Sequence, residues 1–156
     1  MKREPTTAPM RVLIVEDEAV LLMQLQAALE AAGHVVVGTA MSAEEALPLI
    51  EEARPELVLL DLHLRDGSSG LDVARAVRND DDVTIVFLTA NDRKLISDFE
   101  GAAAVIAKPF SARALEGSIS YLEECLHHRS PSMEVPVGMC LAPAYLARLE
   151  NLRAAS

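Results

Sequence analysis

The chain has 156 residues, of which 51% are hydrophobic, and its 24 acidic against 14 basic side chains give a formal net charge of -10. This length favours one domain with a short appendage over a multidomain enzyme, and the hydrophobic fraction excludes a disordered chain. Because nucleic-acid affinity comes mostly from Lys and Arg that neutralise phosphates, the acidic balance argues against direct nucleic-acid binding.

The start of the chain and its cysteines indicate a protein of the reducing cytoplasm. The first apolar run ends at Glu16 and is far shorter than the hydrophobic region of a signal peptide. Cys125 and Cys140 stand apart, with neither a CxxC motif nor a histidine at zinc-ligand spacing. No stretch approaches the roughly 18 apolar residues of a membrane span, so we expect no membrane partner.

Short apolar runs alternate along the chain with segments whose apolar residues recur at helical spacing. The runs are rich in β-branched residues, which is typical of strands buried on both faces. The expected strands are Arg11 to Val15, Val35 to Val37, Leu57 to Leu60, Val83 to Leu88 and Ala103 to Ala107. The expected helices are Glu18 to Ala32, Ser42 to Ala53, Gly70 to Asn79, Asn91 to Phe99 and Ser111 to His127.

Strict alternation of strand and helix predicts parallel strands joined by right-handed crossovers. The fold class is therefore α/β, with a doubly wound five-stranded parallel sheet. A proline-containing stretch after Arg129 predicts a linker, and a final segment around Pro143 carries apolar residues on one helical face. Those residues are Leu141, Tyr145, Leu149 and Leu152. The expected organisation is a flexible N-terminus at 1–9, a domain at 10–129, and a linker with a C-terminal amphipathic helix at 130–156.

Polar side chains stand where the expected strands end. They are Glu16 and Asp17 after the first strand, Asp61 after the third, Thr89 after the fourth and Lys108 after the fifth. Because ligands of open α/β sheets bind outside the carboxyl ends of the strands, we expect these groups in one crevice. Three carboxylates gathered there would raise one another's pKa unless a divalent cation such as Mg²⁺ neutralised them. A lysine and a hydroxyl beside such a metal are what a phosphoryl group needs, so the sequence predicts a site for phosphoryl transfer.

Four short motifs carry this constellation. They are VEDE with Glu16 and Asp17, LVLLD ending in Asp61, FLTA with Thr89, and AKPF with Lys108. Each motif alone is a weak signal, but the four in this order at strand ends resemble the receiver domain of two-component response regulators. The resemblance covers about residues 10–129 and implies a flavodoxin-like strand order of 2-1-3-4-5.

The resemblance implies how the phosphoryl group is handled. Asp61 would accept it from the phosphohistidine of a sensor histidine kinase or a phosphotransfer protein. Thr89 and Lys108 would each contact a phosphoryl oxygen. Catalysis would then consist of positioning and charge neutralisation, so the domain would be a switch and not a turnover enzyme.

The same resemblance implies a set of Mg²⁺ ligands. Asp17 and Asp61 would bind the ion through their carboxylates and His63 through its backbone carbonyl, while Glu16 would act mostly through a metal-bound water. The side chain of His63 is expected at the mouth of the crevice, where it could control the access of water.

The chain also departs from the family pattern. Receivers usually carry Tyr or Phe three positions before the lysine, where this chain has Val105, so the usual relay from the threonine to an aromatic cannot operate in this form. The stretch between Thr89 and Lys108 is a few positions short, which predicts a truncated or displaced fourth helix. Arg65 replaces a family proline, and the loop Asp66 to Gly70 is one residue longer, so the geometry of this loop is expected to differ.

Too few residues follow Arg129 for an output domain, which predicts a stand-alone cytoplasmic response regulator. It would signal by contact with an unknown downstream protein or serve as a phosphorelay intermediate, and the C-terminal helix could dimerise, bind a partner or fold back. One alternative is a pseudo-receiver that acts by interaction alone, which Val105 favours. Another is a haloacid-dehalogenase-type phosphatase, which requires a second acid where this chain has His63.

Overall fold

The computed structural model describes residues 8–64, 67, 69–90, 99–128 and 134–155. The strands are β1 (Arg11–Val15), β2 (Val35–Ala40), β3 (Leu57–Asp61), β4 (Thr84–Thr89), β5 (Ala104–Ala107) and β6 (Met139–Leu141). The helices are α1 (Ala19–Ala31), α2 (Ala43–Ala53), α3 (Gly70–Ala76), α4 (Ala112–Glu123) and α5 (Pro143–Ala155). A 3₁₀ turn lies at Phe99–Gly101, and a π-helical turn at Glu124–His128 continues α4. The strands form one sheet in the order β2-β1-β3-β4-β5-β6.

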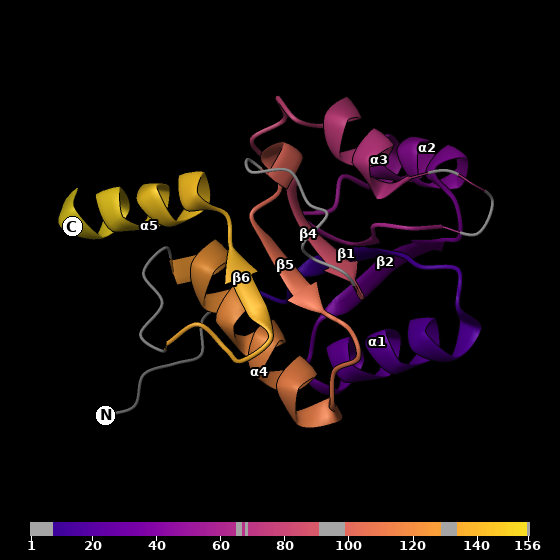
Figure 1. The fold of residues 1–156 in the computed structure, drawn as a ribbon, viewed down its shortest axis with the longest axis horizontal. Coiled ribbons are helices and arrows are strands. Elements are labelled where there is room, and N and C mark those ends of the chain that lie inside the picture. The colour runs from indigo at the N-terminus through magenta and orange to yellow at the C-terminus, as the bar shows by residue number, and fades with distance from the viewer. Residues whose placement is uncertain (1–7, 65–66, 68, 91–98, 129–133, 156) are drawn as a thin grey trace.

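Helices cover both faces of this sheet, with α1 and α4 on one face and α2 and α3 on the other (Figure 1). Successive strand residues alternate between two hydrophobic clusters. In β1, Val12 and Ile14 belong to the cluster under α1 and α4, whereas Leu13 and Val15 belong to the cluster under α2 and α3. Burial on both faces explains why the strands read as unbroken apolar runs. The doubly wound α/β arrangement is therefore confirmed for β1 to β5, which are parallel.

Serine side chains begin the two helices that follow the loops after β3 and β5. The Ser69 hydroxyl accepts a hydrogen bond from the Leu71 amide at 3.0 Å, and Asp72 completes a capping box with it. The Ser111 hydroxyl accepts from the Ala114 amide at 3.0 Å. Each cap satisfies an amide that has no partner within its helix, so the caps fix where α3 and α4 start relative to the sheet.

The sheet has one strand more than the expected five-stranded parallel sheet. β6 pairs with the outer edge of β5 and runs antiparallel to it. β6 lies at the junction between the expected linker and the expected C-terminal helix, and the sequence predicts no strand there because three residues are too few to show a period of two. Leu141, which was expected on the C-terminal helix, therefore lies in β6, and α5 begins at Pro143.

Two further segments differ from their expected form or fall outside the described chain. α3 ends at Ala76 and not at Asn79. Of the helix expected over Asn91 to Phe99, residues 91–98 lie outside the described part, and Phe99 has a φ of 54° within the 3₁₀ turn.

Residues 65, 66 and 68 of the loop after β3 are likewise outside the described part, as are residues 1–7 of the expected N-terminus. Within the ranges that are described, no helix combines the length and the apolar character that crossing a bilayer requires.

Candidate functional site

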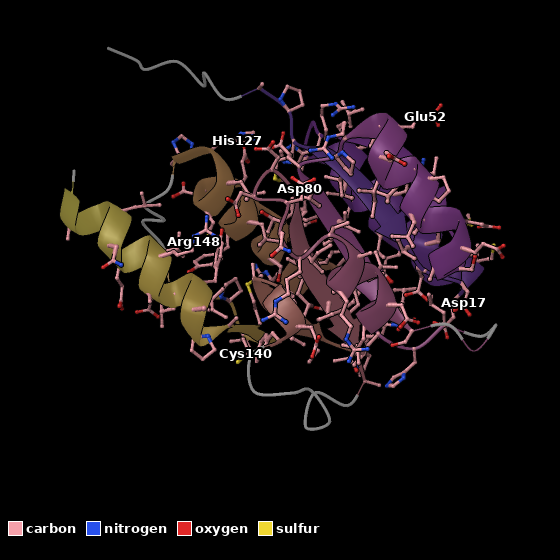
Figure 2. The ribbon with its side chains drawn as sticks, turned by 90° about the horizontal axis from the view of Figure 1, so that it is seen from above. Asp17, Glu52, Asp80, His127, Cys140 and Arg148 are labelled. Carbon is pink, nitrogen blue, oxygen red and sulfur yellow. The ribbon has the colours of Figure 1, made fainter. Side chains whose placement is uncertain are left out.

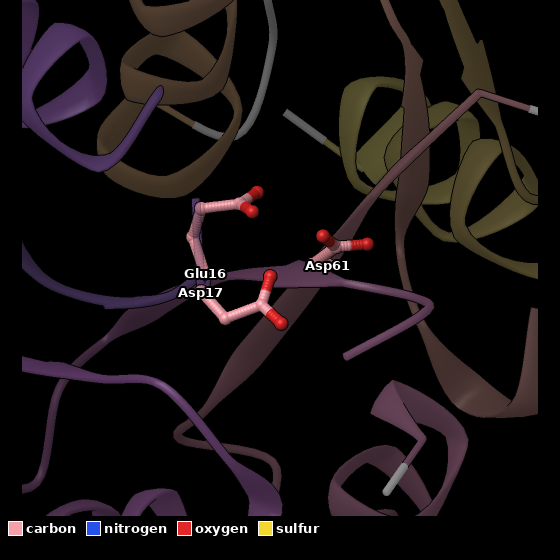
Figure 3. A group of neighbouring side chains, drawn as sticks. All are labelled: Glu16, Asp17 and Asp61. Carbon is pink, nitrogen blue, oxygen red and sulfur yellow. The ribbon is translucent and has the colours of Figure 1, made fainter. Parts of the chain in front are cut away.

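Three carboxylates converge beyond the carboxyl ends of β1 and β3, which are neighbours in the sheet. Glu16 and Asp17 follow β1 directly, and Asp61 is the last residue of β3. One oxygen from each carboxylate lies within 4.8 Å of the other two, and all three residues are buried. The side chains turn toward a common point (Figure 3). Such a set of hard oxygen ligands could hold a divalent cation.

Backbone amides orient two of these carboxylates. The Glu18 N–H donates to Glu16 Oε2 at 3.1 Å, and the His63 N–H donates to Asp61 Oδ1 at 2.9 Å. In both cases an acid bonds the amide two residues further along its own loop, a local pattern that holds the side chain in place. Each acid therefore has one oxygen fixed by the backbone and the other directed into the crevice.

Lys108 follows β5 and bridges the two free oxygens. Its Nζ lies 3.0 Å from Asp61 Oδ2 and 3.1 Å from Glu16 Oε1, and its side chain is 17% exposed. The Lys108 backbone N–H donates to the Thr89 carbonyl at 2.8 Å, which joins the end of β5 to the end of β4. The peptide bond between Lys108 and Pro109 is cis.

The charges in the crevice do not balance. Burial, with a smaller contribution from the charge of Asp61, raises the pKa of Glu16 to about 7, although the Glu18 amide and Lys108 act in the opposite direction. Burial opposes the charged form of Lys108, but its hydrogen bonds and charge interactions with Asp61 and Glu16 outweigh this and raise the Lys108 pKa. One ammonium therefore does not compensate three buried carboxylates. A divalent cation would supply the missing positive charge, so these residues fit one.

Gly70 packs against the backbone of Asp61, and sequence reasoning missed this contact. A Cβ atom at this position would lie 2.4 Å from the carbonyl oxygen of Asp61. The Gly70 N–H also donates to the Leu62 carbonyl at 3.0 Å, which draws the start of α3 against the end of β3. A signal was present, because Gly70 is the first residue of α3, a position where helix propensity disfavours glycine.

Thr89 and His63 complete the surroundings of the acids. Thr89 is the last residue of β4 and is buried, and β4 lies between β3 and β5 in the sheet. His63 is exposed, as expected for the mouth of the crevice. An open cleft of about 230 Å³ leads to the acids. Its lining residues are Asp17, Glu18, Asp61, His63, Ala90 and Lys108.

The structure thus brings most of the predicted site together. Glu16, Asp61 and Lys108 are in direct contact, and Asp17 shares their crevice. Thr89 is joined to Lys108 through the backbone. The roles of these residues, and of the His63 carbonyl as a metal ligand, stay predictions.

The chain matches a known protein family over most of its length. The model of the response regulator receiver domain matches residues 12–120, which is more than half of the chain. The chain therefore belongs to the response regulator receiver family, and the resemblance drawn from the four motifs is confirmed. Receiver domains are signalling switches and not enzymes, which agrees with the expectation from sequence.

Two curated relatives illustrate the match. The phyllosphere-induced regulator PhyR of Methylorubrum extorquens is 40% identical over 111 residues, which cover 70% of this chain and 42% of the relative. The transcriptional regulatory protein PdtaR of Mycobacterium tuberculosis is 36% identical over 152 residues, which cover 80% of this chain and 73% of the relative. The chain spans less than half the length of the first of these proteins.

Solved structures show the same fold. The solution structure of the PhyR receiver domain of Erythrobacter litoralis superimposes with a TM-score of 0.66 at 33% identity, covering 81% of this chain and 98% of that one. A two-component response regulator of the LuxR family from Aurantimonas covers 94% of this chain and 99% of that one, with a TM-score of 0.65. At 22% identity, the second comparison concerns the fold alone.

Proposed function

We propose that this receiver is a phosphoacceptor switch in which Asp61 takes a phosphoryl group from the phosphohistidine of a histidine kinase or phosphotransfer protein. The observation that carries the proposal is the bridge made by Lys108, whose Nζ contacts Asp61 Oδ2 and Glu16 Oε1 within one buried acidic crevice. A lysine held this way places positive charge where a phosphoryl oxygen would arrive, beside the carboxylate that would attack.

The step is a substitution at phosphorus. An Asp61 carboxylate oxygen forms the new bond to phosphorus, while the bond from phosphorus to the donor's imidazole nitrogen breaks and its electron pair stays on that nitrogen. The His63 amide already fixes Asp61 Oδ1, so Asp61 Oδ2 is the oxygen directed toward a donor. Lys108 would pair with the transferred group, and the Thr89 hydroxyl would donate to another of its oxygens.

Asp17, Asp61 and the His63 carbonyl would hold Mg²⁺, with Glu16 acting through a bound water. When bound, the ion supplies the positive charge that the three acids lack and attracts phosphoryl oxygens. Glu16 then serves to orient Lys108, because its Oε1 is the second acceptor of that ammonium.

We further propose a cytoplasmic role in which the phosphorylated chain signals by contact with another protein and not with nucleic acid. Solved PhyR structures carry the description anti-anti-sigma factor, so a protein of sigma-factor regulation is one class of effector. The intact set of Asp61, Lys108 and Thr89 weighs against the pseudo-receiver. His63 in place of a second acid weighs against the haloacid-dehalogenase type.

The test is labelling with a small phosphodonor. Incubation with acetyl phosphate and Mg²⁺ should add one phosphoryl group, seen by intact mass, and the Asp61→Asn variant should stay unlabelled. Asp82→Asn is the matched control and should label like the wild type. The Asp82 side chain is 88% exposed and lies before β4, at the end of that strand opposite to the acids. Labelling of the Asp61→Asn variant would refute the assignment.

A further inference from the structure

The outer edge of β5 is covered by the chain's own C-terminus. Residues 138–155, which we call the C-terminal strap, comprise Gly138, β6, Ala142 and α5. β6 pairs with β5, and the Ala142 N–H donates to the Ala103 carbonyl at 2.8 Å. Figure 1 shows β6 alongside β5 and α5 projecting beyond α4. The strap thus occupies an edge that would otherwise present unpaired backbone groups.

The strap begins beside Ala107, the residue that precedes Lys108 of the site. The Ala107 N–H donates to the Gly138 carbonyl at 2.8 Å, and the next amide, that of Lys108, donates to the Thr89 carbonyl at 2.8 Å. Successive amides of a strand point in opposite directions, so this segment bonds the site on one side and the strap on the other. A backbone shift at Lys108 would therefore be transmitted to Gly138.

Lys108 is the residue that has to move. Its Nζ lies 3.0 Å from Asp61 Oδ2, the oxygen directed into the crevice. A phosphoryl group on that oxygen would stand where the ammonium now lies, so Lys108 would have to change its position to pair with the new group. Val105 stands where receivers usually carry an aromatic residue, and it lies directly opposite Cys140 of β6. β5 therefore contacts the strap at the position that the aromatic residue normally occupies.

The strap is held lightly compared with the other elements. β6 contributes three ladder positions, and Met139 within it and Ala142 just after it are buried. Among the described side chains of α5, Leu149 is the buried one and Tyr145 is half-buried, whereas Leu146 and Leu152 are 42% and 37% exposed. Elements with few buried apolar side chains open at lower free energy than core strands, so a small change at its first residue can shift its docking.

We propose that phosphorylation of Asp61 releases the C-terminal strap from β5, which makes the strap the output element of this receiver. The proposal rests on the proposed phosphoacceptor function. Release uncovers the backbone edge of β5 together with the side of α4 and its π-helical turn that carries Cys125 and Leu126. A free strand edge beside an apolar helix surface suits a partner protein that adds a strand of its own.

Hydrogen exchange on the full chain tests the proposal. Beryllofluoride with Mg²⁺ serves as the phosphoryl mimic, and its binding is followed separately by fluorine NMR. We expect exchange over residues 138–146 to become faster by about tenfold, while β1 and β3 keep their protection. Bound beryllofluoride with unchanged exchange in the strap would overturn the inference, whereas absence of binding would instead refute the phosphoacceptor function. Asp61→Asn should show neither binding nor release.

A disulfide lock provides the matched control. Ala104 and Leu141 are directly opposed between the hydrogen-bonded pairs of the β5–β6 ladder, a geometry that brings their Cα atoms to about 4.5 Å, within the range of a disulfide. In a Cys140→Ser background, Ala104→Cys with Leu141→Cys should, when oxidised, bind beryllofluoride without releasing the strap. The reduced form should release it like the wild type. Release that persists in the oxidised form, or a disulfide that forms between two chains, would contradict an intramolecular strap.

Discussion

The rim of the sheet that carries Glu16, Asp17 and Asp61 and the C-terminal strap are built in opposite ways. At the rim, two of the three buried acids, Glu16 and Asp61, are fixed by backbone amides and by Lys108. The strap docks through three strand positions and three buried side chains, those of Met139, Ala142 and Leu149. The difference shows how a receiver can combine a rigid chemical site with an element of low local stability that responds to it.

Removal of the ammonium should have the largest effect on the rim. In the Lys108→Ala variant, the acids lose the group that contacts Asp61 Oδ2, and we expect phosphorylation by acetyl phosphate to slow by about 100-fold. Intact mass against time measures the rate. Lys108→Arg keeps the positive charge and should recover part of the phosphorylation rate. Equal rates for both variants and the wild type would show that the rim needs no cation at this position.

The close approach of Gly70 to Asp61 should have the next largest effect. Because a Cβ would lie 2.4 Å from the Asp61 carbonyl oxygen, Gly70→Ala should lower the free energy of unfolding by about 2 kcal/mol and slow phosphorylation. Gly117→Ala is the control, since its Cβ would meet no atom within 4 Å, and α4 should gain about 0.5 to 1 kcal/mol. Urea unfolding measures both. A Gly70→Ala variant with an unchanged free energy of unfolding would contradict a rigid contact between Gly70 and Asp61.

Leu149→Ala probes the strap in the same experiment. Truncation of a buried core leucine such as Leu59 should cost about 3 kcal/mol, but the loss at Leu149 cannot exceed the free energy that docks the strap, and we expect about 1 kcal/mol. Leu152→Ala, at a residue that is 37% exposed, should change stability by less than about 0.5 kcal/mol. A loss at Leu149 as large as that at Leu59 would place α5 within the core.

The smallest effect is a pH dependence where the strap meets the end of α4. Burial raises the pKa of the Cys125 thiol to about 11 from its ordinary 9.0, and hydrogen bonds with Tyr121 and Tyr145 partly oppose this. The unfolded chain therefore loses this proton first, and stability should fall as the pH rises from about 9 to 11. The urea midpoint should depend less on pH between about 9 and 10 in Cys125→Ala; above pH 10 Tyr145, whose pKa burial also raises, adds a pH dependence of its own. An unchanged slope in that variant would exclude Cys125 as the source.

Much of the rim could be predicted from the sequence, because its charged residues stand at the carboxyl ends of strands. Glu16, Asp61 and Lys108 each stand directly beyond a continuous apolar run, and parallel strands bring such positions to one edge. Gly70 could not be assigned in this way, because its contact with Asp61 depends on how closely α3 approaches β3.

The strap could be predicted only in part. Pro143 marked the start of a helix, but β6 depends on pairing with the edge of β5, and three residues carry no period that would reveal it. Likewise, Phe99 has a positive φ in a turn whose Glu100 accepts a hydrogen bond at 2.9 Å from Arg75 Nε, 25 positions earlier in the chain. Local pattern does not encode such long-range pairings.

The antiparallel direction of β6 has a practical consequence. The strand runs from Met139, opposite Ile106, to Leu141, opposite Ala104, so α5 departs from the end of the sheet opposite to the acids. Figure 2 shows Asp17 and Arg148 toward opposite ends of the molecule. A fluorophore or surface anchor joined after residue 155 would leave the crevice open to a docking kinase while reporting directly on the motion of α5.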